Sequence, residues 1–366
     1  MSGWRIISTS LMIGGVLGAL YLTAAVRRFG FVKLLSRGKK PLGWLISAAV
    51  IGAVFGLVTL TMSYINGVIV LLHAVLFFLL SGLVMRIVKA VRRKETRLYW
   101  QGILAVSGTV ICLAAGYYLC HRVKQTDYSL TTAKELGTLK IALFADSHMG
   151  STFDGEGFAR HMETIAQQQP DIVIIAGDFI DSASDTETVR AACRALGDMD
   201  VKYGVWFTYG NHDSGRRRGA EFPEGSLEAE LEACGVHVLA DEVELIDGRF
   251  YLIGRKDASD KSRAPMAELT AGLDGSKFMI VSDHQPNDYD NEAAAGVDLV
   301  LSGHTHGGQL FPATFAGEWF GMNDSTYGYE RRGDTDFIVT SGISDWNIQF
   351  KTGTSSEYVV ITVNGQ

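Results

Sequence analysis

The chain has 366 residues, enough for one large domain or two of ordinary size, and a formal charge of −7 at neutral pH. Residues 1–125 contain fifteen Lys and Arg and one acid, whereas residues 126–366 contain eighteen basic and thirty-nine acidic residues. The acidic part argues against a general nucleic-acid-binding protein, which needs clustered Lys and Arg, so an anionic substrate would have to be recognised through metals. We therefore divide the chain into a membrane domain (1–125) and an acidic domain (126–366).

Four apolar stretches in the first domain have the length of transmembrane helices, which need about 20 apolar residues each. No Asp, Glu, Lys or Arg interrupts them, and the second and third follow each other closely enough to form a helical hairpin. His73 lies in the third stretch without a neighbouring carboxylate, so we interpret it as an interhelical hydrogen-bonding residue. The helices are interpreted as an anchor, and they span about residues 6–26, 41–62, 64–85 and 98–119.

The connections between the stretches predict the orientation in the membrane. Six Lys and Arg lie between the first and second stretches and six between the third and fourth. Short basic loops mark the cytoplasmic face, which predicts a multi-pass cell-membrane protein with an extracytoplasmic acidic domain. Arg122 and Lys124, on the expected outer side, count against this orientation. A cleaved signal peptide is the alternative for the first stretch, because Arg5 precedes its apolar run, but we favour four retained helices.

From about Leu139 the pattern changes to short β-rich runs that end in polar residues. Segments 157–169 and 186–199 have helical patterns, so this part opens as β-α-β-α-β, typical of a layered α/β domain. Residues 249–254, 336–342 and 357–363 suggest a second, more antiparallel sheet. The expected fold is a four-layer α-β-β-α sandwich preceded by four transmembrane helices. The polar-ended runs are LKIALFAD (139–146), DIVIIAGD (171–178), YGVWFTYGN (203–211), FMIVSDH (278–284) and DLVLSGH (298–304).

The polar ends of these runs are candidate metal ligands, because ligands of open α/β sheets bind beyond the carboxyl ends of the strands. Asp146 and His148 are two apart, the spacing that places side chains on one side of an extended segment, and His304 and His306 repeat it. The full set is too large for one structural zinc, which takes four ligands, and suits two octahedral ions that share a carboxylate. It comprises Asp146, His148, Asp178, Asn211, His284, His304 and His306.

In chain order the motifs D-x-H, G-D-x-x-D, G-N-H-D, H and G-H-x-H-G-G resemble the calcineurin-like metallophosphoesterase superfamily over about residues 138–365. The resemblance implies two divalent metals, one held by Asp146, His148, Asp178 and His306, the other by Asp178, Asn211, His284 and His304. Two cations about 3.5–4 Å apart would lower the pKa of a shared water and supply hydroxide for in-line attack on phosphorus. Mn, Fe or Zn suit these donors, and we favour Mn.

The resemblance also implies that His212 is a catalytic residue rather than a ligand. It would contact the phosphate, either as proton donor to the leaving group or as a stabiliser of charge on the oxygens, and Asp213 would orient it. Asp181 is interpreted either as an acceptor for a ligating His or as an exposed turn residue. Residues 216–218, three Arg, would either bind a second phosphate or lie in a solvated loop.

Two further features leave alternatives open. The aromatic-rich residues 313–332 would either wall the pocket or pack into a core. Cys193 and Cys234 are expected as unpaired thiols, with a disulfide as the alternative in an oxidising compartment.

The leading functional prediction is a membrane-anchored hydrolase of a phosphodiester, pyrophosphate or phosphomonoester. By analogy with lipid-sugar pyrophosphatases and broad phosphodiesterases of that superfamily, its partner would be a phosphorylated small molecule or a lipid-linked envelope substrate. A non-catalytic metal-containing scaffold is the first alternative, and the complete ligand set together with His212 argues against it. A membrane sensor or transporter with an appended domain is the second, and the lack of charged residues within the spans argues against it.

Overall fold

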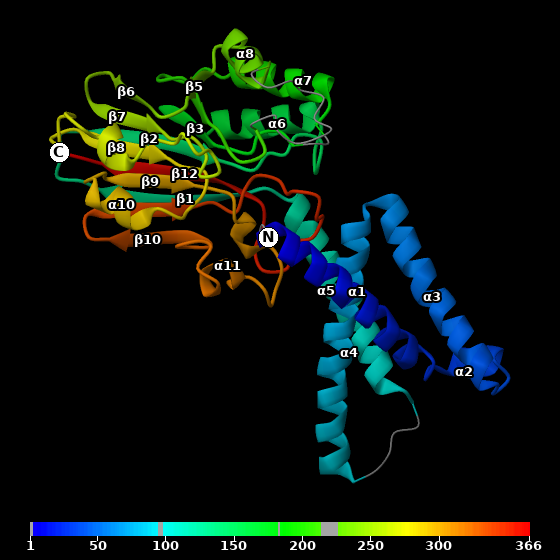
Figure 1. Cartoon of the computed structure of the whole chain (residues 1–366). Helices are drawn as coiled ribbons and strands as arrows, with labels where there is room; N and C mark the ends of the chain where they lie inside the picture. Colours follow the sequence, from blue (N-terminus) through cyan, green and yellow to red (C-terminus); the bar gives the residue numbers. More distant parts are fainter. Residues whose placement is uncertain (1–2, 94–97, 182–183, 214–225) are drawn as a thin grey trace. The chain divides into compact units, whose positions relative to one another are not determined.

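The computed structural model describes residues 3–93, 98–181, 184–213 and 226–366. It divides into two compact units, the first formed by residues 1–118 with 347–350 and the second by residues 119–346 with 351–366. Figure 1 shows the helices of the first unit and the layered sheets of the second.

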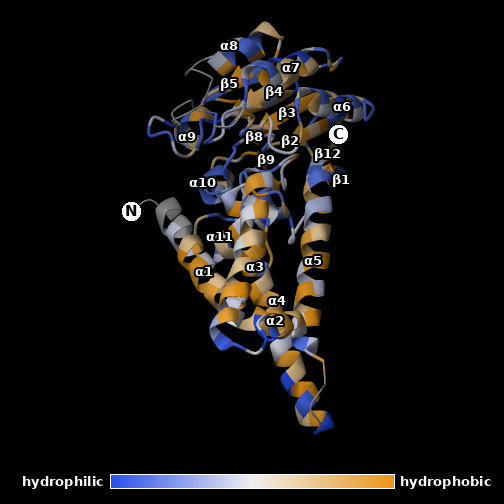
Figure 2. Ribbon diagram, turned by 90° about the vertical axis from the view of Figure 1, so that its right-hand side faces the viewer, coloured by the Kyte–Doolittle hydropathy of each residue, from blue (hydrophilic) through white to orange (hydrophobic). Residues whose placement is uncertain are grey.

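The first unit is helical. Its four long helices are each long and apolar enough to cross a membrane, and hydrophobic residues run along them (Figure 2). Ser63 caps α4 (Tyr64–Arg92) by accepting a hydrogen bond from the backbone N–H of Asn66. Because the preceding helix ends at Thr61, the connection between these two helices is only two residues long. In chain order the helices are α1 (Gly3–Val26), the short α2 (Gly30–Leu35), α3 (Lys40–Thr61), α4 (Tyr64–Arg92) and α5 (Trp100–His121), whose last three residues belong to the second unit.

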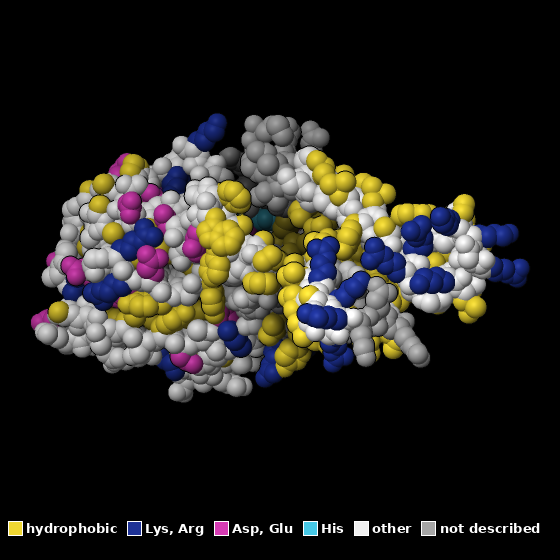
Figure 3. Space-filling view, turned by 90° about the horizontal axis from the view of Figure 1, so that it is seen from below, with side chains coloured by type: hydrophobic (Ala, Val, Ile, Leu, Met, Phe, Trp, Pro, Cys, Tyr) yellow, Lys and Arg dark blue, Asp and Glu magenta, His cyan; other side chains and the backbone are white. Residues whose placement is uncertain are grey.

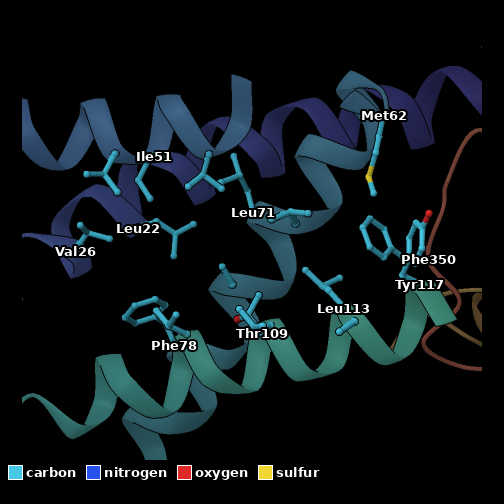
Figure 4. A pocket seen from close by; sticks show the side chains of 17 residues that line it. Leu22, Val26, Ile51, Met62, Leu71, Phe78, Thr109, Leu113, Tyr117 and Phe350 are labelled. Atoms are coloured by element: carbon cyan, nitrogen blue, oxygen red, sulfur yellow. The ribbon is translucent and has the colours of Figure 1, made fainter. Parts of the chain in front are cut away.

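Residues 347–350 belong to this helical unit although they lie far along the chain. Buried Asn66 of α4 holds them, because its Nδ2 donates to the carbonyl of Asn347 (2.9 Å) and its Oδ1 accepts from the N–H of Gln349 (2.9 Å). Within the unit an apolar cavity of 730 Å³ lies among the helices (Figure 4). Its wall includes Leu22, Ile51, Leu71, Phe78, Leu113 and Phe350.

The second unit contains two six-stranded sheets. The first sheet has the strand order β1-β12-β2-β3-β4-β5, formed by β1 (Lys124–Thr131), β12 (Glu357–Asn364), β2 (Thr138–Phe144), β3 (Ile172–Ala176), β4 (Val205–Thr208) and β5 (His237–Leu239). The second has the order β10-β11-β9-β8-β7-β6, formed by β10 (Gly328–Arg332), β11 (Thr335–Val339), β9 (Leu299–Ser302), β8 (Phe278–Ser282), β7 (Phe250–Gly254) and β6 (Glu242–Ile246).

Side chains alternate between the two faces of each strand, so each sheet packs against a different layer on each face. In β2, Ile141 and Leu143 point into a core shared with Leu252 of the second sheet, whereas Phe144 points to the opposite face. There it packs with Phe158 of α6 (Gly155–Ala166) beside α7 (Thr186–Gly197). On the outer face of the second sheet, Tyr289 of α10 (Tyr289–Ala294) packs with α9 (Met266–Leu269). Together with α8 (Ser226–Ala233) these layers confirm the predicted α-β-β-α sandwich.

The arrangement of the strands differs from the prediction in three respects. The sequence did not predict β1, β5, β6 and β10, strands that carry several exposed or half-buried side chains. The strand β12 was expected in the second sheet but lies within the first, parallel to β1 and antiparallel to β2. The second sheet is parallel at its centre, where β7, β8, β9 and β11 run in one direction. Apolar runs specify strands but not their neighbours, because pairing depends on distant segments of the chain.

Candidate metal centre

Seven polar residues follow the carboxyl ends of five strands. Asp146 and His148 come after β2, Asp178 after β3, Asn211 after β4, His284 after β8, and His304 and His306 after β9. Five of them have left-handed backbones: Asp146 (φ 56°), His148 (φ 38°), Asp178 (φ 54°), His304 (φ 70°) and His306 (φ 49°). Such conformations are uncommon outside glycine, and their clustering at one place marks a site whose geometry the surrounding fold imposes.

These side chains converge into three groups whose ligand atoms lie within 4.8 Å of one another. The first joins Asp146, His148 and His306, and the third joins Asp178, His284 and His304. The second joins His148, Asp178 and His212, so it links the other two. The Oδ2 atom of Asp178 lies 3.2 Å from Nε2 of His284 and 3.7 Å from Nε2 of His148. The structure therefore brings six of the seven predicted ligands together in these groups, with Asp178 central, while Asn211 belongs to none of them.

Burial and charge make this centre suited to divalent cations. Asp146 and Asp178 are almost completely buried, and burial raises the pKa of Asp146 to about 7. Burial also lowers the pKa of His304 to about 4, which leaves a neutral imidazole able to bind a metal. The buried Oδ1 of Asn211 has no hydrogen-bond partner among the described residues. A cation would compensate the buried carboxylates and satisfy this oxygen.

A backbone carbonyl orients the imidazole of His284, and a carboxylate lies beside that of His306 without a hydrogen bond to it. Nδ1 of His284 donates to the carbonyl of Ala176 (2.7 Å), which directs Nε2 toward Asp178. Burial lowers the pKa of His284, but the neighbouring carboxylate of Asp178 raises it more, so the pKa lies well above its usual value. A metal bound at Nε2 would displace the proton from this nitrogen. Nδ1 of His306 lies 3.3 Å from Oδ1 of Asp345, a buried carboxylate that the sequence analysis did not single out. A hydrogen-bonding partner such as the carbonyl of Ala176 fixes the ring orientation of a metal-ligating His.

Asp213, which was predicted to orient His212, binds the backbone of two loops through its carboxylate. Its carboxylate accepts hydrogen bonds from the backbone N–H groups of Asp178 (2.7 Å), Phe179 (2.8 Å), Ile180 (3.0 Å) and Gly210 (2.7 Å). It thereby joins the loop after β3 to the loop after β4. A Cβ on Gly177 (φ 81°) would lie 2.6 Å from the backbone nitrogen of Gly210, so the two loops also require glycine.

His212, the predicted catalytic residue, lies beside His148 and Asp178. Its Nε2 is 3.9 Å from Oδ2 of Asp178, and its ring centroid is 4.7 Å from that of His148 and 5.5 Å from that of Trp346. Trp346 lies outside the motifs, so no sequence signal pointed to it.

The remaining predicted residues fall in different places. Asp181 is buried with Oδ2 3.9 Å from Nδ1 of His148, which favours the acceptor over the exposed turn residue. Cys193 and Cys234 are free, as expected. Residues 216–218 lie outside the described residues. The alternative that residues 313–332 pack into a core is wrong for Trp319 and Phe320, whose side chains are exposed.

Comparison with known proteins identifies the domain that this fold and centre define. Residues 139–308 match the calcineurin-like phosphoesterase family, and the chain contains a domain of that family. Cj0846 of Campylobacter jejuni, an uncharacterised metallophosphoesterase, is 29% identical over 253 residues, 67% of this chain and 63% of that protein. A Danio rerio transmembrane protein with metallophosphoesterase domain is 29% identical over 245 residues, 63% of this chain and 54% of that protein.

YkuE of Bacillus subtilis, also an uncharacterised metallophosphoesterase, is 27% identical over 202 residues, 54% of this chain and 69% of that protein. The chain spans less than two thirds of the length of Cj0846 and of the Danio rerio protein. Among solved structures, TT1561 of Thermus thermophilus covers 58% of this chain and 90% of its own, with 11% identity and a TM-score of 0.38, a likeness too low to bear on the fold.

Proposed function

We propose that the chain is a membrane-anchored phosphoesterase whose centre holds two divalent metals. The observation that carries this proposal is the central position of Asp178, whose carboxylate is shared by two of the ligand groups. Asp146, His148 and His306 would hold one metal, and Asn211, His284 and His304 the other, with Asp178 between them. Such metals, Mn being favoured over Fe and Zn, supply an activated water and neutralise phosphoryl oxygens.

The residues of the chain supply the remaining chemistry. His212, within 3.9 Å of the bridging carboxylate, would donate a proton to the leaving oxygen or a hydrogen bond to a phosphoryl oxygen. Asp213 would hold the loops that carry Asp178 and His212 through its four backbone hydrogen bonds. The substrate would carry a phosphodiester, pyrophosphate or phosphomonoester bond. The charge of the acidic domain disfavours general nucleic-acid binding.

The helical unit supports a membrane setting for this activity. We infer that all four long helices span the bilayer and that the phosphoesterase domain lies on the outer side, because the basic connections favour the cytoplasmic face. The name of the Danio rerio relative, a transmembrane protein with metallophosphoesterase domain, supports the membrane setting. A lipid-linked or envelope substrate would fit this location.

The proposal is tested with the full chain purified in detergent, using 4-nitrophenyl phosphate, bis(4-nitrophenyl) phosphate and a lipid pyrophosphate. Hydrolysis should be lost after chelation and restored by Mn. Asp178→Asn should lower kcat/KM by about 10²–10³-fold or more, because it removes a charge at the reacting centre. Asp334→Asn, at a fully exposed carboxylate, should leave the rate unchanged. A folded, Mn-loaded chain that hydrolyses none of these substrates would favour the scaffold alternative.

A further inference from the structure

A short segment of the second unit exposes an unusual number of large apolar side chains. In the aromatic segment (residues 311–322), the exposed fractions are 61% for Phe311, 49% for Phe315, 71% for Trp319, 78% for Phe320 and 46% for Met322. Elsewhere in the described part of this unit, only Leu245, Tyr327 and Tyr329 are large, apolar and exposed. Contiguous apolar surface of this kind marks an interaction site.

Figure 3 shows hydrophobic side chains gathered where Figure 1 places α11 (Ala316–Trp319), the helical turn within this segment. The rings of Phe315 and Trp319 lie 6.4 Å apart, so these two side chains approach each other on the surface.

The backbone of the aromatic segment is ordered although its side chains point outward. The N–H of Phe320 donates to the carbonyl of Ala316 (3.0 Å), and that of Met322 donates to the carbonyl of Gly317 (2.8 Å). The start of the segment is tied to a neighbouring loop, since the N–H of Phe311 donates to Oγ1 of Thr352 (3.0 Å). A hydrogen-bonded backbone that presents apolar side chains to the outside is a preformed contact surface.

Short stretches of chain connect the aromatic segment's unit to the candidate spans. The candidate span α5 ends at His121 and β1 begins at Lys124. Because a chain extends at most about 3.6 Å per residue, β1 begins within about 11 Å of the end of that helix. Thr352 accepts the hydrogen bond from Phe311 at the start of the aromatic segment. It lies two residues after Phe350, the last of the residues 347–350 that belong to the helical unit.

The composition of the aromatic segment specifies how it would bind lipid. Trp and Phe favour the boundary between headgroups and acyl chains, where an apolar face inserts by about 5–10 Å. Residues 311–322 contain no Lys or Arg, and their one charged residue is the exposed Glu318. Apolar insertion, rather than attraction to anionic lipids, would therefore supply the affinity.

We propose that the aromatic segment inserts into the bilayer in which the chain's own helices are anchored. Phe311, Phe315, Trp319, Phe320 and Met322 enter the interfacial layer, and Glu318 stays at the water side. The segment begins five residues after His306, so the insertion holds the ligand loop after β9 at the lipid surface. This insertion rests on the proposed membrane anchoring and not on catalytic activity.

The test places a nitroxide at position 320 by Phe320→Cys in the full chain, reconstituted into phosphatidylcholine vesicles. Cys112→Ala and Cys234→Ala remove the two native thiols that are not buried. The matched control is Leu245→Cys, at an exposed apolar residue of β6 in the same unit. Collision with oxygen, which concentrates in lipid, should exceed collision with a water-soluble nickel chelate several-fold at position 320 and not at 245. The ratio should not change with salt or with phosphatidylglycerol.

Two results would overturn the proposal. The first is equal, water-like accessibility at positions 320 and 245. The second is protection of position 320 from both reagents together with cross-linking between chains, which would show that a second copy covers the segment. If Phe320→Cys fails to fold, judged by its melting temperature, Phe311→Cys gives the same comparison at the other end of the segment.

Discussion

At the scale of single residues, the centre combines ligands that the motifs identify with partners that only their surroundings reveal. His212 has a motif position, a buried side chain and contacts with His148 and Asp178. Asp345, in contrast, has no motif, yet it lies beside both His306 and the fully buried Lys351, whose Nζ is 3.6 Å from Oδ2. Burial raises the pKa of Asp345 to about 7, against the effect of Lys351. The function of such a residue depends on neighbours rather than on sequence spacing.

The prediction at the scale of single residues concerns the catalytic role proposed for His212. His212→Ala should lower kcat for bis(4-nitrophenyl) phosphate by about 10²–10⁴-fold, because a positioned proton donor or hydrogen-bond donor is lost. The metal content, measured by elemental analysis, should stay the same, because His212 is not one of the proposed ligands. His237→Ala is the control, since this imidazole stacks on Trp206 away from the ligand loops. Unchanged hydrolysis by the His212 variant would disprove the proposed mechanism.

At the scale of elements, a buried ionic cluster joins the ends of β7 and β8 to α10. Arg255, after β7, is 2% exposed, and its Nη1 lies 3.0 Å from Asp283, 2.8 Å from Asp288 and 3.3 Å from Glu292. Burial, reinforced by Asp283, raises the pKa of Glu292 well above its usual range. Because Asp283 precedes His284, the cluster holds the strand end that presents a ligand.

Removing the buried Arg255 from this cluster should be costly, although Asp283 keeps Arg263 as a second partner. Arg255→Met leaves the buried Glu292 without its cation, and breaking a buried pair in this way typically lowers the free energy of unfolding by about 3–5 kcal/mol. The matched control is Arg190→Met, because Arg190 pairs with Glu230 at 2.7 Å on the surface, where such a pair contributes about 1 kcal/mol or less. Thermal unfolding in detergent, followed by tryptophan fluorescence, measures both variants. Equal melting temperatures would show that the cluster contributes nothing to stability.

At the scale of the whole molecule, the distribution of charge connects the helices to the placement of the domain. The basic residues of the connections include Lys89 and Arg92 in the last turn of α4, whereas the domain beyond residue 125 is strongly acidic. Lys and Arg in short loops resist translocation, so this asymmetry favours an acidic domain on the outer side.

The orientation is tested with reporter fusions in a bacterial host. Alkaline phosphatase, which is active only outside the cytoplasm, should be active when fused after Gln366 and inactive when fused after Lys39, in the first basic connection. A fluorescent protein that folds only in the cytoplasm should give the opposite pattern. Fluorescence after Gln366 without phosphatase activity would reverse the proposed orientation.

Sequence by itself determined the features that depend on local pattern. Apolar stretches of bilayer length appear without knowledge of the fold, and so do buried strands that end in Asp, His or Asn. The two-residue spacing of Asp146 and His148 is recognisable in the sequence, but in the structure both residues lie beyond the end of β2 with left-handed backbones, so strand alternation does not direct their side chains. The α-β-β-α class follows from the alternation of strands and helices.

The tertiary structure decided what depends on distant neighbours. It placed β12 between β1 and β2, assigned the carboxylate of Asp213 to four backbone N–H groups, and set Asp345 beside His306. It also left Trp319 and Phe320 exposed rather than packed in a core. Pairing, burial and hydrogen bonding join residues far apart in the chain, and no local pattern specifies which distant residues meet.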